Sequence, residues 1–211
     1  MGHPRTLSEA VTAAWLRRHF ASAPPLAESI YGDDGARHAS GEFKPAAVLV
    51  PIIAHEAALT LLLTRRAAHL RFHSGQVSFP GGRVDPADSA PEVTALRETE
   101  EEIGLPRERV ELLGRLPEYR TGTGYRITPV VGLLTPPLAL RPDPNEVDEV
   151  FELPLAVVLD PANHRRDSRE WQGKTRQFFV IPHDTQYIWG ATAGMLVNLY
   201  RHLAQGRLGA P

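Results

Sequence analysis

The sequence contains no cysteine among its 211 residues. Disulfides, thiol nucleophiles, sulfur-ligated zinc and iron–sulfur clusters are therefore excluded. Long apolar runs are absent as well, because the two longest, residues 46–54 and 57–63, are separated by His55 and Glu56. Both fall far short of the ~18 to 20 apolar residues that a membrane span requires. We expect no transmembrane helix and no membrane partner.

An excess of charge of either sign is also lacking. The 23 basic and 25 acidic residues leave a net charge of -2, which does not suit a general nucleic-acid binder. The N-terminus lacks the pattern of a secretory signal, so we expect a cytoplasmic protein. Hydrophobic residues make up 42% and charged residues 23%, as in ordinary folded domains.

The length predicts one domain with extensions, because a typical domain has about 150 residues. Residues 1–44 read as an N-terminal helix, over 7–20, followed by a connector rich in Gly, Asp and Ser. Thr6 and Glu9 have the spacing of a capping box for that helix. The domain proper is expected at 45–204, with a tail at 205–211.

The hydrophobic pattern predicts a mixed α/β domain. Apolar segments at 46–53 and 58–65 indicate a strand hairpin, and a polar loop follows to residue 78. Two more helices are expected at 91–103, closed by Gly104, and at 191–203. The remaining strands are expected at 110–116, 127–134, 147–153 and 177–181.

The helix predicted at 91–103 carries the most informative charge pattern. At about 100° per residue, Glu98, Glu101 and Glu102 fall on one side. The apolar residues expected on the opposite side are Val93, Leu96 and Ile103. An ordinary solvated face is one interpretation, but the carboxylates repel one another and Arg97 is the only nearby cation.

A metal site is the alternative interpretation of this helix. Three carboxylates that face one point suit a hard divalent cation such as Mg²⁺, which could then clamp a diphosphate. Gly81 and Gly82 precede the helix and would let the backbone turn sharply or approach a ligand closely.

Two other sequence patterns are weaker indications of function. Residues 122–124 begin like a dinucleotide loop, but no third glycine and no helix follow, so a turn is expected. His69 and His73 have a spacing that could bind zinc, but no third ligand lies nearby in the sequence. We interpret them as contacts to a substrate, with a solvated loop as the alternative.

The segment around the acidic helix resembles the signature of Nudix hydrolases, whose metal helix reads Arg-Glu, two further residues, Glu-Glu, any residue and Gly. Residues 97–104 match that pattern. Two departures are visible: Thr99 stands where an aliphatic residue or alanine is usual, and Asp88 with one extra residue before Arg97 replaces the usual Glu spacing. The role of Asp88 is therefore open, whereas the glutamates of the helix stay in register.

A second motif resembles the coenzyme A pyrophosphatase subgroup of that family. This motif has Leu-Leu-Thr, one variable residue, Arg and a small residue, followed by spaced Arg, Gly and Phe-Pro-Gly-Gly. It is matched by residues 62–67, Arg71, Gly75 and 79–82. The resemblance extends over roughly residues 46–204.

The resemblance implies a Nudix α/β/α sandwich with a mixed sheet and Mg²⁺ or Mn²⁺ as the cofactor. The implied reaction is hydrolysis of the diphosphate of coenzyme A or an acyl derivative, and the implied partner is that small molecule; a homodimer is compatible with it. The metal ligands would be Glu98, Glu101 and Glu102. The catalytic residues would be Glu98, Glu101, Arg97 and Glu146. Arg97 would orient Glu101, and Glu146 would act as a base or as an extra metal ligand. The substrate-binding residues would be Arg66, His69, Arg71, His73, Gly81 and Gly82.

Two alternatives remain open. The substrate could be another nucleoside diphosphate derivative, such as ADP-ribose or a dinucleotide. The chain could also be a binding or regulatory module that has kept the fold and lost turnover, although it retains Arg97 and the three glutamates of the helix.

Overall fold

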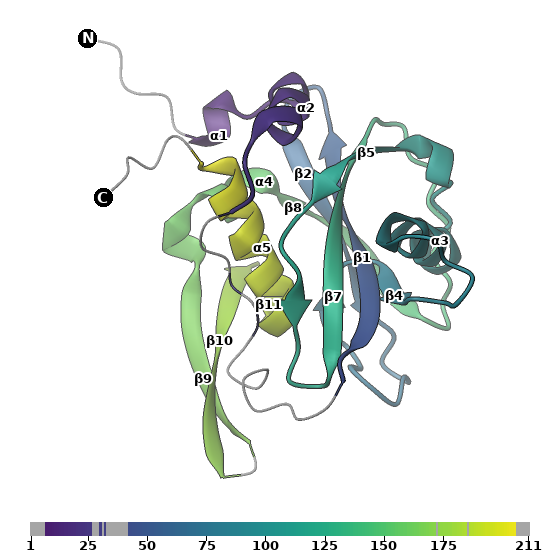
Figure 1. Cartoon of the computed structure of the whole chain (residues 1–211), viewed down its shortest axis with the longest axis vertical. Coiled ribbons are helices and arrows are strands. Elements are labelled where there is room, and N and C mark those ends of the chain that lie inside the picture. The colour runs from purple at the N-terminus through teal and green to yellow at the C-terminus, as the bar shows by residue number, and fades with distance from the viewer. Residues whose placement is uncertain are drawn as a thin grey trace.

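A mixed β-sheet lies between helices on both of its faces (Figure 1). The computed structural model describes residues 7–26, 30, 32, 42–171, 173–184 and 186–205. The predicted α/β class is confirmed. The expected capping residue Thr6 and the tail beyond residue 205 lie outside the described residues.

Strands β1 and β7 form the centre of the main sheet and run parallel to each other. The other strand pairs of this sheet are antiparallel, which makes the sheet mixed. The strand order is β3-β2-β1-β7-β5, with β4 on β1, β6 on β7 and β8 on β2. The strands are β1 (Lys44–Ala54), β2 (Leu59–Arg66), β3 (Val77–Ser78), β4 (Gly81–Arg83), β5 (Val110–Arg115), β6 (Tyr119–Arg120), β7 (Tyr125–Leu134) and β8 (Val147–Pro154).

The predicted hairpin of β1 and β2 is confirmed. Strand β1 is buried continuously over residues 46–53, because helices cover both faces of the sheet. On one face, Ala95 and Ile103 of helix α3 (Pro91–Ile103) pack against the inward residues of β1. On the other face lie α4 (Leu155–Leu159) and α5 (Gly190–Leu203). Figure 1 shows α3 and α5 on opposite sides of β1 and β7.

The prediction of a single N-terminal helix over 7–20 is wrong in one respect. The segment forms two helices, α1 (Leu7–Ala10) and α2 (Ala13–Ser22). Thr12 interrupts them in an extended conformation and accepts a hydrogen bond from the Trp15 amide at 3.2 Å through its hydroxyl. A threonine that caps a new helix in this way ends the preceding one.

Helix α3 agrees with the predicted bounds. Pro91 occupies its first turn, and Gly104 ends it in the left-handed conformation at φ 66°. The predicted C-terminal helix is also confirmed as α5, one residue longer at its start. None of the helices in the described part of the chain is long and apolar enough to cross a lipid bilayer.

A second sheet of three antiparallel strands was largely missed. It consists of β9 (Arg165–Trp171), β10 (Lys174–His183) and β11 (Gln186–Trp189), whereas the sequence predicted only 177–181. Residues 165–170 of β9 are exposed, so β9 lacks the alternation of apolar and polar residues by which a strand can be predicted. Strands β3, β4 and β6 and helix α4 were missed because they are too short to show a period.

Candidate active site

Helix α3 packs on the sheet through small side chains, and this orientation differs from the prediction. Its buried residues are Thr94, Ala95, Thr99, Glu102 and Ile103, whereas Val93 and Leu96 are only partly buried. Of the three apolar residues expected on one side, Ile103 is buried, but the rest of the buried stripe consists of small residues and Glu102. As a result Glu102 faces the sheet instead of solvent, and Thr99 satisfies its hydroxyl by donating to the Ala95 carbonyl at 2.6 Å.

The glycines of β4 allow the helix to approach the sheet. Strand β4 pairs with β1, and the Gly81 amide donates to Glu102 Oε2 at 3.4 Å. A Cβ added to Gly82 would lie 2.6 Å from Glu98 Oε1. The carboxylates of Glu98 and Glu102 therefore rest directly against glycine backbone, and a side chain at position 82 would displace the Glu98 carboxylate.

Glu102 is the buried acid of the site. It is 3% exposed, and its Oε1 lies 3.7 Å from Nη1 of Arg66 at the end of β2. Burial raises the pKa of Glu102 to about 8; the charge of Arg66 opposes this shift, and the charges of Glu146 and Glu98 add to it. Without a further cation, this carboxyl is mostly protonated at neutral pH.

Arg97 holds the other two glutamates of the helix. Its Nη1 donates to Glu98 Oε1 at 2.8 Å and to Glu101 Oε2 at 3.1 Å. Its Nη2 donates to the backbone carbonyl of Arg83 at 3.2 Å. Burial raises the pKa of Glu98 in spite of the hydrogen bond from Arg97. One guanidinium thus fixes two carboxylates and ties them to the end of β4.

Asp88, whose role the sequence left open, is the principal partner of Arg97. Its two oxygens accept from Arg97 Nη2 at 2.9 Å and Nε at 3.3 Å, and the Thr94 hydroxyl donates to it at 2.8 Å. Hydrogen bonds from Arg97, and then from the Asp85 amide, hold the pKa of Asp88 well below its usual range. A fork-to-fork pair of this kind fixes the direction of the guanidinium. The irregular spacing before Arg97 was the only signal of this role in the sequence.

Glu146 approaches the site from a separate loop. Its charge raises the pKa of both Glu98 and Glu102, which places it within electrostatic reach of them. The loop is fastened to the end of α3 by two backbone bonds, from the Asp143 amide to the Glu102 carbonyl at 2.9 Å and from the Arg141 amide to the Ile103 carbonyl at 2.8 Å.

The neighbouring acids of this loop do not join the site. Arg65, for which the sequence pattern predicts no role, forms ion pairs with Asp148 at 3.2 Å and Glu149 at 2.7 Å. In the part of the chain that the structure describes, Glu146 makes no ion pair. Asp148 and Glu149 are thus neutralised by Arg65, whereas Glu146 remains within electrostatic reach of Glu98 and Glu102.

The loop over residues 66–76 is joined to the same acidic turn. The Ala67 amide donates to the Glu146 carbonyl at 2.9 Å, and His69 Nε2 is hydrogen bonded to the Asn145 carbonyl at 3.1 Å. His73 Nδ1 is bonded to Gln76 Oε1 at 2.9 Å, so both histidines shape the loop. Arg71 makes no ion pair with a described residue and lies 5.5 Å from the ring centroid of Phe72.

The donor set suits a divalent cation in its chemistry. Oxygen ligands are what Mg²⁺ and Mn²⁺ prefer, and a bound cation would favour the ionised forms of Glu98 and Glu102, whose pKa values are raised by burial and by the charge of Glu146. Among the described residues no three acidic or histidine groups converge tightly enough to hold an ion as they stand. The carboxylates instead turn to Arg97 and Arg66, the nearest cations.

Comparison with known proteins agrees with this arrangement. Residues 43–172 match the family model of the NUDIX domain. The chain belongs to the Nudix hydrolase family. Like other members, this Nudix hydrolase is an enzyme for nucleoside diphosphate derivatives, and enzymes of the family generally use divalent metal ions.

Similar proteins include two curated bacterial relatives that are both called uncharacterized Nudix hydrolase NudL. The protein of Photorhabdus laumondii subsp. laumondii is 44% identical over 154 residues, which cover 73% of this chain and 82% of the relative. The protein of Escherichia coli K12 is 42% identical over 156 residues, which cover 74% and 81%.

Two solved structures are also similar. RenU, a Nudix hydrolase from M. smegmatis, has a TM-score of 0.47 and 24% identity, and the match covers 56% of this chain and 74% of RenU. The NUDIX domain of Shewanella oneidensis NrtR, solved with ADP ribose, has a TM-score of 0.43 and 23% identity, with 71% and 87% covered.

Replacement of Asp88 by asparagine tests how Arg97 is held. The amide keeps the shape but removes the charge that faces the guanidinium, so Arg97 should point less firmly at Glu98 and Glu101. Loss of an outer partner of this kind typically costs about 10 to 100-fold in metal affinity or activity. We expect a fall of that size in kcat/KM for a hydrolysed diphosphate and a matching rise in the Mg²⁺ concentration for half-maximal rate. Wild-type values of both would mean that Asp88 does not position Arg97.

Proposed function

We propose that this Nudix hydrolase cleaves the diphosphate of coenzyme A or its acyl derivatives. The products would be adenosine 3′,5′-bisphosphate and 4′-phosphopantetheine or its acyl form. The catalytic domain would comprise residues 45–204, with residues 1–44 as an N-terminal extension. The resemblance of residues 62–82 to the coenzyme A pyrophosphatase motif supports this narrower substrate.

The position of the loop over residues 66–76 beside the acidic site supports this substrate. The loop over residues 66–76 begins at Arg66, 3.7 Å from Glu102, and is hydrogen bonded through Ala67 to Glu146. A substrate whose diphosphate meets the carboxylates would therefore extend past this loop. Arg71 offers a cation that no described acid neutralises, and coenzyme A carries a further phosphate, at the ribose 3′ position, that such a cation could bind.

Each side chain of the site has a proposed role in the reaction. Glu98, Glu101 and Glu102 would bind Mg²⁺ or Mn²⁺, which when bound neutralises the diphosphate and lowers the pKa of the attacking water. Arg97 is a positioning residue that orients two of these carboxylates. Glu146 would accept a proton from water, because Glu98 and Glu101 are already hydrogen bonded to Arg97. Arg66, His69, Arg71 and His73, together with the open backbone of Gly81 and Gly82, would bind the substrate.

A direct assay tests the substrate. Purified protein with Mg²⁺ is incubated with coenzyme A or with ADP-ribose, and the products are identified by mass. We expect kcat/KM to favour coenzyme A. A preference for ADP-ribose would support a different nucleoside diphosphate derivative, and no turnover of either, together with retained binding, would support a non-catalytic module.

Arg71 provides the sharper test of specificity. A charge-assisted hydrogen bond to phosphate is worth about 1.5 to 3 kcal/mol, which corresponds to roughly 10 to 150-fold in binding. We expect Arg71→Ala to lower kcat/KM for coenzyme A by that factor and to leave 3′-dephospho-coenzyme A almost unchanged. Arg71→Lys keeps the charge and should recover part of the loss. Equal losses on both substrates would assign Arg71 to the diphosphate or to the loop itself.

A further inference from the structure

A pocket of about 520 Å³ lies away from the catalytic carboxylates, between α2, the segment from β5 to β6, and α5. None of the proposed catalytic, metal or substrate residues lines it. Its volume falls within the range of small-molecule sites. Its walls are Phe20, Ala23, Pro24, Pro25, Leu26, Gly114, Arg115, Leu116, Pro117, Glu118, Arg120 and His202. Residues 20–26 and His202 lie outside the segment that matches the NUDIX model, so the N-terminal extension and the C-terminal helix form one side of this pocket.

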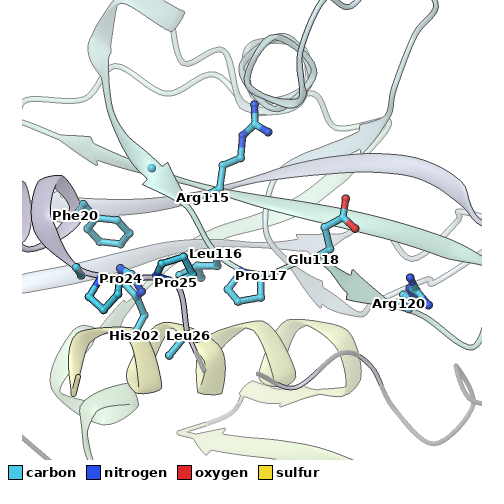
Figure 2. Close-up of a pocket in the computed structure, with 12 residues that line it drawn as sticks. Phe20, Pro24, Pro25, Leu26, Arg115, Leu116, Pro117, Glu118, Arg120 and His202 are labelled. Atoms are coloured by element: carbon cyan, nitrogen blue, oxygen red, sulfur yellow. The ribbon is translucent and has the colours of Figure 1, made fainter. Parts of the chain in front are cut away.

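The pocket has an apolar end and a charged end. Figure 2 shows Phe20, Pro24 and His202 gathered at one end and Glu118 and Arg120 at the other. Leu116 and Pro117 lie between these ends (Figure 2). An occupant would therefore be elongated, with an apolar body and a polar head.

One charged residue that lines the pocket, Arg120, has no ion-pair partner among the described residues. Arg115 is held by both oxygens of Glu92 at 2.6 Å, and Glu118 lies 3.6 Å from Nε of Arg126. Arg120 makes no ion pair with any described residue; its guanidinium lies 5.4 Å from the ring centroid of Phe43. The head group that complements this end is an anion.

His202 contributes a buried, neutral ring to the apolar end of the pocket. The residue is 7% exposed, and its Nε2 finds no hydrogen-bond partner in the described part of the chain. Burial lowers the pKa of His202 to about 4, with a smaller effect from the charge of His19, so the ring is neutral at pH 7. The neutral ring packs against Phe20, with 4.6 Å between the ring centroids, so it forms part of the apolar wall.

We propose that this pocket is a second binding site for a small elongated organic anion, in the class of medium-chain carboxylates, with its apolar chain between Phe20, Leu116 and His202 and its carboxylate at Arg120. The site is independent of the proposed hydrolysis, because the two share no residue.

Calorimetric titration with sodium octanoate, in buffer with Mg²⁺ and no nucleotide, tests the site. We expect saturable binding of one octanoate per chain. Arg120→Gln should weaken it by roughly 10 to 150-fold, the range for a charge-assisted hydrogen bond. Uncharged 1-octanol should bind the wild type more weakly by a similar factor. Ala23→Trp should abolish binding, because the indole would fill the pocket from the C-terminal end of α2.

The matched control is Arg18→Gln, which removes an exposed arginine of α2 that does not line the pocket. We expect its affinity for octanoate to equal that of the wild type. Thermal unfolding of each variant shows whether it is folded. No saturable binding up to about 10 mM octanoate would overturn the proposal. Affinity unchanged by Ala23→Trp would place the ligand elsewhere and overturn it too, and equal affinity for 1-octanol would overturn the anionic head group.

Discussion

Glu102→Gln should abolish most of the turnover of this Nudix hydrolase while the protein stays folded. The amide occupies the same space but cannot supply the charge expected of a metal ligand. Metal-assisted stabilisation of a transition state is worth several kcal/mol, and each ~1.4 kcal/mol is tenfold in rate. We therefore expect kcat to fall at least about 100-fold at saturating Mg²⁺. Near wild-type turnover would remove Glu102 from the metal site.

The same substitution should make the metal-free protein more stable at alkaline pH. The folded state keeps the proton of Glu102 up to a pKa of about 8, whereas the unfolded chain releases it near the ordinary value of 4.5. Between these values the folded state binds more protons, so the free energy of unfolding falls as the pH rises. Glu102→Gln removes this decline and should gain roughly 1 to 4 kcal/mol at pH 8, with little gain at pH 4.

Chemical denaturation in EDTA at pH 4, 6 and 8 measures this effect. Glu101→Gln is the matched control, because that carboxylate is 57% exposed and should show nearly the wild-type pH dependence. Equal slopes against pH for the two variants would show that Glu102 does not hold a proton in the folded protein.

The adjacent glycines Gly81 and Gly82 should respond to alanine in opposite ways. At Gly81 the backbone has φ +152°, and an added Cβ would lie 2.6 Å from the Cα of Val48 in β1. Backbone atoms in the central strand cannot move aside. Strain of the dihedral angle and overpacking each cost about 1 to 3 kcal/mol, so Gly81→Ala should lower the melting temperature by at least about 5 °C.

At Gly82 an added Cβ meets only the far end of the Glu98 side chain, which can rotate away. Gly82→Ala should therefore unfold within about 3 °C of the wild type but lose at least about 100-fold in kcat, because Glu98 leaves Arg97. Gly124→Ala is the control for Gly81, since it has φ +86° and open space around it. A Gly81 variant as stable as the Gly124 variant would contradict the close packing of β4 on β1.

Strong periodic segments made much of the fold predictable. The hairpin of β1 and β2 was visible because both strands are long and apolar, and α3 was visible because Pro91 and Gly104 mark its ends. The sequence also singled out the glutamates of α3, because a cluster of like charges with one arginine is costly on a simple solvated helix.

The orientation of α3 could not be predicted from hydropathy. Thr94, Ala95 and Thr99 are small rather than strongly apolar, but small residues let a helix approach a glycine strand closely. The role of Asp88 depends on a contact with Arg97 across a turn, which no periodic pattern reports. Strand β9 could not be predicted because its exposed polar residues have the composition of a loop.

The attachment of the Glu146 loop to α3 has a consequence for which substitutions the enzyme can accept. The two bonds that fasten the loop, from Arg141 and Asp143 to the carbonyls of Ile103 and Glu102, use only main-chain atoms. Any residue except proline can donate them. The side chain at position 141 is therefore free to vary without moving Glu146. Position 143 is more constrained, because Asp143 Oδ1 also accepts hydrogen bonds from the Asn145 main-chain amide at 2.9 Å and from its side-chain amide at 2.8 Å. The position of the Glu146 carboxylate thus depends on the path of the backbone and on one aspartate in the turn before it.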